Sequence, residues 1–570
     1  MQIIKPFYLN DTSILINLTT SLCKSKLEIL NSKGFKTVYK HFLDSISINS
    51  NRKLYKLKSR LKKPYDIIVL YKLLIIYSFD EATNSKEDLN ILMDYQVELL
   101  YFTERLYDFW RNYERYGILQ RRLTSGQKNN KALIENTNIF LDNVIALYRM
   151  LLSKLSNESV NVYRQTPAGF NAGFIVTPSL NNLPKGYEVL SNIDIINAIM
   201  IRTPFIGHSK SNSRSGLFTE IDHNPISNLK LTKRHWLCYP IKVGETYAHI
   251  YFHRTLLHHG VGLSNLFEPA FDEYLKGTKP DLVYVYGNFE TKNDKTFYID
   301  EENGIYVGYV SRIAENDYFG YMKKMILTLH NVYMIKNSKL PIHGAMVNIV
   351  LDNDEEKNIV IIGDSGAGKS ETLEALRFVA DEQIKEMNII FDDMGVFYLR
   401  NNEVFAKGTE IGAFIRLDDL ETGYAYKELD RAIFLNPERI NARVILPVST
   451  YEFIVKEHKI DYVFYANNYE DSEESIRLFN NLNEALPVFI EGKRKAKGTT
   501  SEVGLVSSYF SNPFGVVQFE EESKAIIDKV FSSLFESQIV VGELYTKLGI
   551  PGKENTGVKK AAKAIKKLLK

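Results

Sequence analysis

The chain has 570 residues, more than a single hydrophobic core usually supports, so we expect about two or three domains. Apolar residues make up 45% and charged residues 25%, the balance of a globular protein, which excludes wholesale disorder. The formal net charge of +2 gives no overall argument for a nucleic-acid or membrane partner. Two cysteines, Cys23 and Cys238, are too few for a disulfide framework and fit a reducing, cytoplasmic compartment.

Residues 1–155 are expected to form an all-helical region. Segments 65–79, 88–115 and 131–155 place apolar residues at helical spacing and contain few glycines. The most apolar of them, 65–79, is interrupted by Lys72 and is too short to span a bilayer. The N-terminus lacks the layout of a signal peptide. We find no catalytic constellation here, and interpret the region as an extension available to a protein partner.

From about residue 160 the pattern changes to short β-type runs separated by Gly, Pro and Asn. Residues 247–253 and 282–286 are predicted strands. We therefore expect residues 156–320 to form an α/β domain.

Three histidines, His253, His258 and His259, cluster in this part of the sequence. No acidic or cysteine partner stands near them at the spacing of a metal site. We therefore favour ordinary packing or surface histidines over metal ligands.

The strongest motif fits the pattern G-x-x-x-x-G-K-[ST] and consists of Gly363, Asp364, Ser365, Gly366, Ala367, Gly368, Lys369 and Ser370. An apolar run, residues 358–362, precedes it, and a predicted helix, residues 371–380, follows it. Such a loop turns its backbone amides around phosphate, and the helix N-terminus adds partial positive charge. Lys369 is expected to reach the outer phosphates, and the Ser370 hydroxyl to ligate Mg²⁺. The motif predicts a nucleoside triphosphate site.

A second predicted strand, which follows this loop in the sequence, ends in two carboxylates. The apolar run 388–391 ends in Asp392 and Asp393. Acidic residues at the end of such a strand provide the oxygen ligands that a nucleotide-bound metal needs. We therefore expect residues 321–570 to form a P-loop nucleotide- and metal-binding domain that opens with a helix near Tyr321.

With these motifs in place, residues 160–570 resemble the ATP-type phosphoenolpyruvate carboxykinases. Residues 318–324 resemble the lysine motif of that family, and Pro341-Ile342-His343-Gly344 its histidine motif, both in the family's order before the phosphate loop. Further matches are Lys279-Pro280-Asp281, Glu410-Ile411-Gly412, Asn441-Ala442-Arg443 and Arg202-Thr203-Pro204. The resemblance implies a carboxykinase-like α/β fold, with residues 156–320 on the substrate side.

The resemblance also implies residue roles. Lys324, His343 and Asp393 would hold a Mn²⁺ ion, while Lys369, Ser370 and Asp392 would serve the phosphates and Mg²⁺ of ATP. A small dicarboxylate substrate would be faced by Arg202, Tyr318, Ser365 and Arg443. Catalysis would fall to Lys324, Ser365, Lys369, Asp392 and Arg443. A lysine can ligate a metal only when uncharged, which requires burial and nearby cations to lower its pKa.

Some positions depart from the carboxykinase pattern. Tyr321, Met325 and Ser501 stand where the family has glutamate, glycine and arginine, and the loss of the arginine predicts a weaker nucleotide contact. The phosphate loop and Ile342-His343-Gly344 are more similar to the HPr serine kinases. Those enzymes share the nucleotide-binding fold but phosphorylate a protein hydroxyl.

The first functional hypothesis is therefore an ATP-dependent carboxykinase, which converts oxaloacetate and ATP to phosphoenolpyruvate, ADP and CO₂. The alternative is a kinase acting on a protein or small-molecule hydroxyl, with Asp392 or Asp393 as general base and the helical extension recognising the target. A third hypothesis is a nucleotide-binding regulatory module without turnover. Neither a nucleic acid nor a membrane is expected as a partner.

Overall fold

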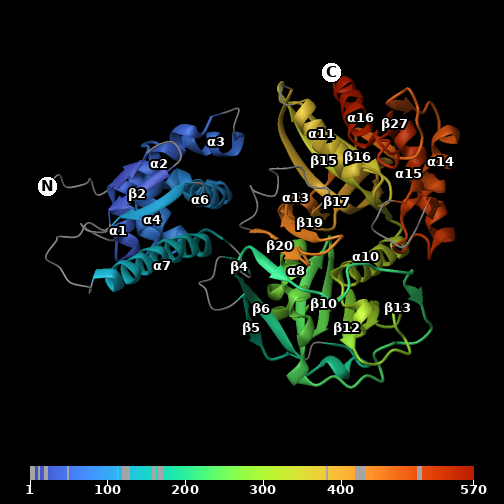
Figure 1. The fold of residues 1–570 in the computed structure, drawn as a ribbon, viewed down its shortest axis with the longest axis horizontal. Helices are drawn as coiled ribbons and strands as arrows, with labels where there is room; N and C mark the ends of the chain where they lie inside the picture. Colours follow the sequence, from blue (N-terminus) through green and yellow to red (C-terminus); the bar gives the residue numbers. More distant parts are fainter. Residues whose placement is uncertain are drawn as a thin grey trace. The chain divides into compact units, whose positions relative to one another are not determined.

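The computed structural model describes residues 7–9, 13–17, 23–47, 51–111, 113–118, 129–156, 162–164, 171–180, 183–380, 383–417, 431–496 and 504–569. Over these ranges the chain is a mixed α/β protein that divides into two compact units, residues 1–160 and 161–570 (Figure 1). Among the residues described, no helix combines the length and the apolar character needed to cross a bilayer.

The first unit packs helices around an apolar core that includes Leu99, Phe102 and Leu106. Its helices are α1 (Lys26–Asn31), α2 (Lys33–Ser45), α3 (Arg52–Arg60), α4 (Asp66–Leu74), α5 (Phe79–Asn84), α6 (Gln96–Arg111) and α7 (Asn129–Leu155), with a 3₁₀ segment, η1 (Glu87–Tyr95). The predicted helix 65–79 is divided in two. Ser78 and Glu81 form a capping box, which starts the new helix α5 at Phe79.

The expectation of an all-helical N-terminal region was wrong, because this unit also contains a small sheet. Its strands are β1 (Phe7–Leu9), β2 (Ser13–Asn17) and β3 (Glu114–Ile118), in the order β1-β2-β3. β2 pairs antiparallel with β1 and parallel with β3, far away in the sequence. Each strand is too short to give a clear periodic pattern, and the parallel pairing depends on tertiary structure.

The second unit contains two large mixed sheets. The first has the order β4-β6-β9-β10-β12-β14-β13-β8, with β5 beside β6 and β11 beside β9. Its strands are β4 (Val162–Arg164), β5 (Ala172–Thr177), β6 (Asp194–Ile201), β8 (Thr219–Glu220), β9 (Trp236–Val243), β10 (Thr246–His253), β11 (Glu268–Pro269), β12 (Leu282–Asn288), β13 (Thr296–Asp300) and β14 (Ile305–Ser311). The predicted strands 247–253 and 282–286 are thus confirmed.

The central strands of this first sheet, β9, β10, β12 and β14, are buried on both faces. Alternate residues of β10 enter different cores: Ala248 and Ile250 on one face, Tyr247 and Tyr251 on the other. The accompanying helices are α8 (Leu257–Leu266), α9 (Phe271–Leu275) and α10 (Phe319–Lys336). Because α10 contacts β12 and β14 as well as β15, it joins the two large sheets.

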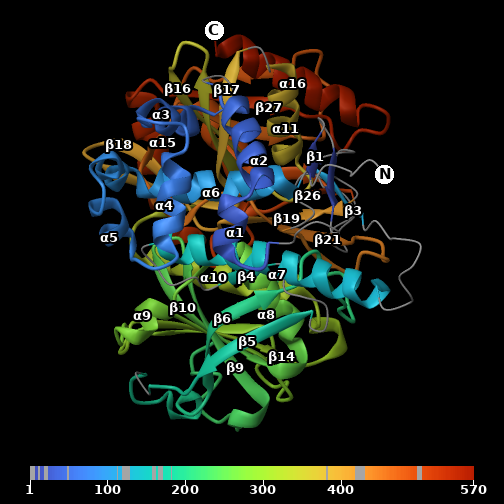
Figure 2. The same ribbon diagram turned by 90° about the vertical axis from the view of Figure 1, so that its left-hand side faces the viewer.

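The second large sheet carries the phosphate loop and has the order β22-β18-β17-β15-β16-β23-β27-β24. Its strands are β15 (Leu340–Leu351), β16 (Glu356–Ile362), β17 (Ile384–Arg400), β18 (Glu403–Gly408), β22 (His458–Lys459), β23 (Tyr462–Asn467), β24 (Ile476–Leu478) and β27 (Val540–Tyr545). The associated helices are α11 (Lys369–Val379), α13 (Tyr451–Val455), α14 (Leu482–Glu491), α15 (Glu520–Glu536) and α16 (Glu554–Leu568). α11 and α16 lie side by side (Figures 1 and 2).

Two smaller sheets complete this unit. One has the order β19-β21-β20-β7, and the other pairs β25 with β26. Their strands are β7 (Phe205–Gly207), β19 (Gly412–Arg416), β20 (Ile433–Leu435), β21 (Arg443–Pro447), β25 (Lys493–Lys495) and β26 (Leu505–Ser507).

A buried histidine gives the second unit a pH-dependent stability. His249, on β10, is buried, and burial lowers its pKa from 6.5 to about 3. The unfolded chain therefore binds a proton below about pH 6.5 that the folded chain excludes, so this site favours unfolding increasingly from pH 6.5 down to about pH 3. At pH 5 the cost is about 2 kcal/mol.

We expect His249→Gln, which keeps hydrogen-bonding capacity but does not titrate, to lose less stability than the wild type between pH 7.5 and pH 5. Urea unfolding at the two pH values measures this difference. Lys292→Gln, a substitution at an exposed position, is the control and should lose as much as the wild type. Equal losses for His249→Gln and the wild type would contradict this explanation.

Candidate active site

The predicted phosphate loop forms a tight turn between β16 and α11. Gly366 and Gly368 have φ values of +78° and +94°, in the left-handed region that favours glycine. A Cβ atom at Gly368 would lie only 2.8 Å from Thr546 Oγ1. The same hydroxyl donates to the carbonyl of Ala367 at 2.7 Å. The glycine spacing of the motif is therefore required by the backbone and its close neighbours.

The start of the loop is fixed by the neighbouring strand and by an ion pair. The Gly363 amide donates to the carbonyl of His343 at 3.1 Å. The Asp364 carboxylate accepts from the Ser365 amide at 2.6 Å and from Arg494 Nε at 2.8 Å. Ser365 thus lies at the turn itself, next to the strand that carries the histidine motif.

The three residues assigned to the phosphates and Mg²⁺ lie together at the start of α11. Lys369 is buried, and its Nζ donates to the carbonyl of Asp364 at 3.1 Å. Ser370 Oγ donates to Asp392 Oδ1 at 2.6 Å. Burial raises the pKa of Asp392, although the Ser370 hydrogen bond and the Lys369 cation oppose the shift. An oxygen-only pair from Ser370 and Asp392 fits the ligand preference of Mg²⁺.

Strand pairing brings the histidine and aspartate motifs to the same place. Gly344 of β15 lies opposite Ile362 of β16, the last residue before the loop. On its other side, Gly344 lies opposite Asp393 of β17, and His343 lies opposite Met394. The phosphate loop, His343 and Asp393 are therefore set by the register of three adjacent strands.

Asp393 is the centre of a buried polar cluster. Its Oδ2 lies 2.5 Å from Lys323 Nζ and 2.6 Å from Lys324 Nζ, and its Oδ1 lies 3.0 Å from His343 Nε2. Lys323 also pairs with Glu410 Oε1 at 2.9 Å. The structure thus brings together the three residues assigned to Mn²⁺ and adds Lys323 and Glu410, to which sequence analysis gave no role.

The two lysines of this cluster have pKa shifts in opposite directions. Burial lowers the pKa of Lys324 to about 8, and the adjacent Lys323 cation acts in the same direction, whereas Asp393 opposes the shift. For Lys323, burial is outweighed by the carboxylates of Asp393 and Glu410, which raise its pKa. Asp393 is buried, yet the two lysines hold its pKa well below the usual value. Lys324 therefore meets the requirement for a lysine metal ligand better than Lys323 does.

The hydrogen bonds of His343 leave one ring nitrogen available for a cation. Nδ1 lies 2.8 Å from the carbonyl of Ser511, which can only accept, so this nitrogen carries the proton. Burial and the Lys369 cation lower the pKa of His343, which keeps the ring neutral. Its Nε2 then presents a lone pair to Asp393 Oδ1 at 3.0 Å. A cation could bind between the lone pair of His343 Nε2 and the carboxylate oxygen of Asp393. This mixed set of nitrogen and oxygen ligands fits Mn²⁺.

Two of the residues assigned to the substrate gather around the ring of Phe414. The Arg443 guanidinium carbon lies 5.2 Å from the ring centroid, and the Tyr318 ring centroid lies 6.4 Å from it. Lys323 Nζ lies 5.6 Å from the same centroid. Arg443 donates through Nη2 to Asn441, while its buried Nε has no hydrogen-bond partner among the described residues. This geometry leaves Arg443 donors for an anionic ligand.

Arg202 is not brought to this cluster. Its side chain is exposed, and it precedes β7. In the small sheet, Gly207 at the end of β7 lies beside Leu435, and Leu435 lies opposite Arg443. Arg202 adjoins the opposite end of β7, which is farther from Arg443.

Sequence analysis missed Arg494. The side chains of Arg494 and Asp364 are only 4% and 8% exposed, so the ion pair between them is buried beneath the phosphate loop. The basic run 493–495 is visible in the sequence, but no motif spacing marks its central residue. Ser501, where an arginine was missing from the carboxykinase pattern, lies outside the described residues.

Comparison with known protein families and with curated proteins found no match to this chain. The functional interpretation therefore depends on the geometry of the described site and on the sequence motifs that lead to it.

Replacing Lys369 by alanine should weaken ATP binding while leaving the fold intact. The substitution removes the cation that is expected to bind the phosphates and loses one hydrogen bond to a loop carbonyl. A hydrogen bond to a charged group is worth about 1.5–3 kcal/mol, so we expect about ten- to hundredfold weaker binding in a calorimetric titration with ATP and Mg²⁺. Lys459→Ala, which removes an exposed lysine paired with Glu403, is the matched control. Unchanged ATP affinity in Lys369→Ala would rule out the nucleotide assignment.

Proposed function

We propose that this protein is an ATP-dependent phosphotransferase of the carboxykinase type, with oxaloacetate as substrate. The observation that carries the proposal is the convergence of Lys324 Nζ and His343 Nε2 on Asp393, at 2.6 and 3.0 Å, beside the phosphate loop. A kinase that only positions ATP needs the loop and its acidic residues, but not a neutral histidine and a lysine of lowered pKa on the same carboxylate.

In the proposed reaction, oxaloacetate loses CO₂ as its carbon–carbon bond breaks, and the electron pair remains as the enolate of pyruvate. The enolate oxygen then bonds to the γ-phosphorus of ATP while the bond to the β–γ bridging oxygen breaks. The products are phosphoenolpyruvate, ADP and CO₂. A divalent ion held by Lys324, His343 and Asp393 would stabilise negative charge on the enolate and on the transferring group.

The residues of the chain have separate tasks in this proposal. Arg443 binds a substrate carboxylate through its guanidinium group, which suits bidentate pairing. Lys369 holds the outer phosphates, and Ser370 and Asp392 serve the ATP-bound Mg²⁺. Lys323 keeps Asp393 ionised, because its cation lies 2.5 Å from that carboxylate. An ionised, lysine-paired Asp393 is a weak general base, which argues against its use in a hydroxyl kinase.

A hydroxyl kinase remains the second candidate because of two observations. Of the two arginines assigned to the substrate, Arg202 is exposed and lies outside the cluster. Arg443 is therefore the one that is available to bind a dicarboxylate. Burial raises the pKa of Asp392, which makes this carboxylate a better proton acceptor than Asp393. In that reading Asp392 would take the proton of an incoming hydroxyl.

Incubating the protein with ATP, Mg²⁺, Mn²⁺ and oxaloacetate tests the proposal. We expect phosphoenolpyruvate and ADP in equal amounts, and a decrease in turnover of at least about 100-fold in Lys324→Met, since one electrostatic donor at a transition state is worth about 10²–10³ in rate. ATP affinity should stay within about twofold of the wild type, because Lys324 contacts Asp393 and not the phosphate loop.

The matched control is Lys336→Met, at the exposed end of the same helix, where the lysine pairs with Glu522. This control should retain wild-type turnover. If no phosphoenolpyruvate forms while phosphate from ATP appears on a serine or other hydroxyl, the kinase replaces the carboxykinase. Stoichiometric ATP binding without any consumption would instead indicate a regulatory module.

A further inference from the structure

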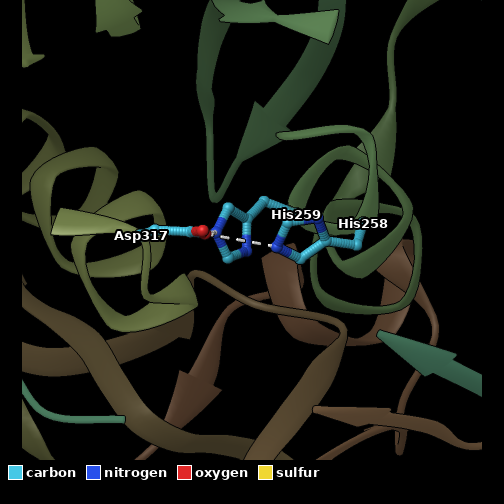
Figure 3. A group of neighbouring side chains, drawn as sticks. All are labelled: His258, His259 and Asp317. Carbon is cyan, nitrogen blue, oxygen red and sulfur yellow. Dashed lines mark hydrogen bonds and ion pairs between the residues drawn. The ribbon is translucent and has the colours of Figure 1, made fainter. Parts of the chain in front are cut away.

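A second cluster of side chains with metal-ligating atoms lies outside the candidate active site. His258 and His259 are in the first turn of α8, and Asp317 precedes Tyr318 and the start of α10 (Figure 3). His259 Nε2 lies 3.0 Å from Asp317 Oδ1, and His258 Nε2 lies 3.4 Å from the same oxygen. One ligand atom from each of the three residues lies within 4.8 Å of the others.

The cluster is nearly enclosed by protein. The side chains of His258, His259 and Asp317 are 14%, 0% and 13% exposed. His258 Nε2 lies 3.4 Å from the carboxylate, outside hydrogen-bond geometry, and has no hydrogen-bond partner among the described residues. Buried polar atoms are normally satisfied, so an imidazole nitrogen without a hydrogen bond beside a carboxylate calls for an explanation.

The spacing of the ligand atoms fits a single metal ion. Zn²⁺ binds histidine nitrogen and carboxylate oxygen at about 2.0–2.2 Å in a tetrahedral arrangement, which places neighbouring ligand atoms about 3.3–3.5 Å apart. The two nitrogen-to-oxygen separations, 3.0 and 3.4 Å, are close to that value. Two histidines and one carboxylate also leave a coordination position for water or another ligand.

We infer that His258, His259 and Asp317 form a binding site for a divalent transition-metal ion such as Zn²⁺. Sequence analysis found no acidic partner near these histidines, because Asp317 is 58 residues beyond His259 and is brought to it only by folding. The inference does not depend on the proposed function, since none of the three residues contacts the phosphate loop or Asp393 in any described interaction.

A metal ion at this site would connect three parts of the second unit. His258 and His259 belong to α8, and Asp317 leads into α10, which carries Lys323 and Lys324. Asp317 also holds the segment after β7, because its Oδ2 accepts from the Lys210 amide at 3.3 Å and its carbonyl accepts from the Ser211 amide at 3.0 Å. We therefore expect the ion to act as a structural clamp beside Tyr318.

Equilibrium dialysis of the full chain against Zn²⁺, followed by measurement of bound metal, tests the inference. The wild type should hold one equivalent of Zn²⁺ that His258→Ala loses, with affinity at this site lowered by at least about 100-fold, because even loss of an outer-shell partner costs 10–100-fold. His208→Ala, which removes an exposed histidine paired with Glu438, should keep the equivalent. His343→Ala should also keep this His258-dependent equivalent, in addition to or without any Zn²⁺ at the candidate active site, which separates the two sites.

A second variant guards against misfolding. Asp317→Asn has nearly the same shape, retains an oxygen that accepts from the Lys210 amide, and removes the anionic ligand; we expect it to lose the same equivalent with an unchanged circular dichroism spectrum. A wild type that binds no Zn²⁺ would overturn the inference directly. Wild-type stoichiometry and affinity in His258→Ala would do so too, as would a His258→Ala/His343→Ala double variant that binds as much Zn²⁺ as His343→Ala.

Discussion

The candidate active site depends on one buried carboxylate. Asp393 lies within 2.5–3.0 Å of two lysine nitrogens and one imidazole nitrogen. Breaking a buried ion pair by removing one partner typically costs about 3–5 kcal/mol, because the remaining charge stays buried without compensation. The position of Asp393 is in turn set by the pairing of β17 with β15, the strand that also borders β16 and its phosphate loop. Sheet register and buried charge therefore determine the site together.

The protonation of the surrounding groups follows from this arrangement. Burial raises the pKa of Glu410 to about 7, although the Lys323 cation opposes the shift. Lys324, with a pKa of about 8, can give up its proton at moderate cost. A divalent cation would replace that proton as the partner of Asp393, while Lys323 continues to hold its other contact with Glu410.

The sequence allowed contiguous features to be predicted and failed where folding joins distant residues. The phosphate loop is a short motif whose glycines are required locally, and its flanking strand and helix, β16 and α11, were confirmed. His343 was singled out through its resemblance to the carboxykinase histidine motif and Asp393 because it ends an apolar strand, and strand pairing brings the two residues together. Arg494 was missed because its partner Asp364 is 130 residues away, and Asp317 because it meets His259 only in the folded chain. The sheet of the first unit was missed for the same reason, since β2 and β3 pair across a long separation.

If His343, Lys324 and Asp393 bind one divalent cation, as proposed, a Mn²⁺ titration will detect the loss of one ligand. Free Mn²⁺ measured by electron paramagnetic resonance gives its affinity for wild type and for His343→Ala, with ATP affinity measured in parallel. Mn²⁺ should bind at least about tenfold more weakly to the variant, whereas ATP affinity should stay within about twofold, because Nε2 of His343 faces Asp393. Identical Mn²⁺ binding in the two proteins would mean that His343 is only a buried core histidine, and would contradict the account.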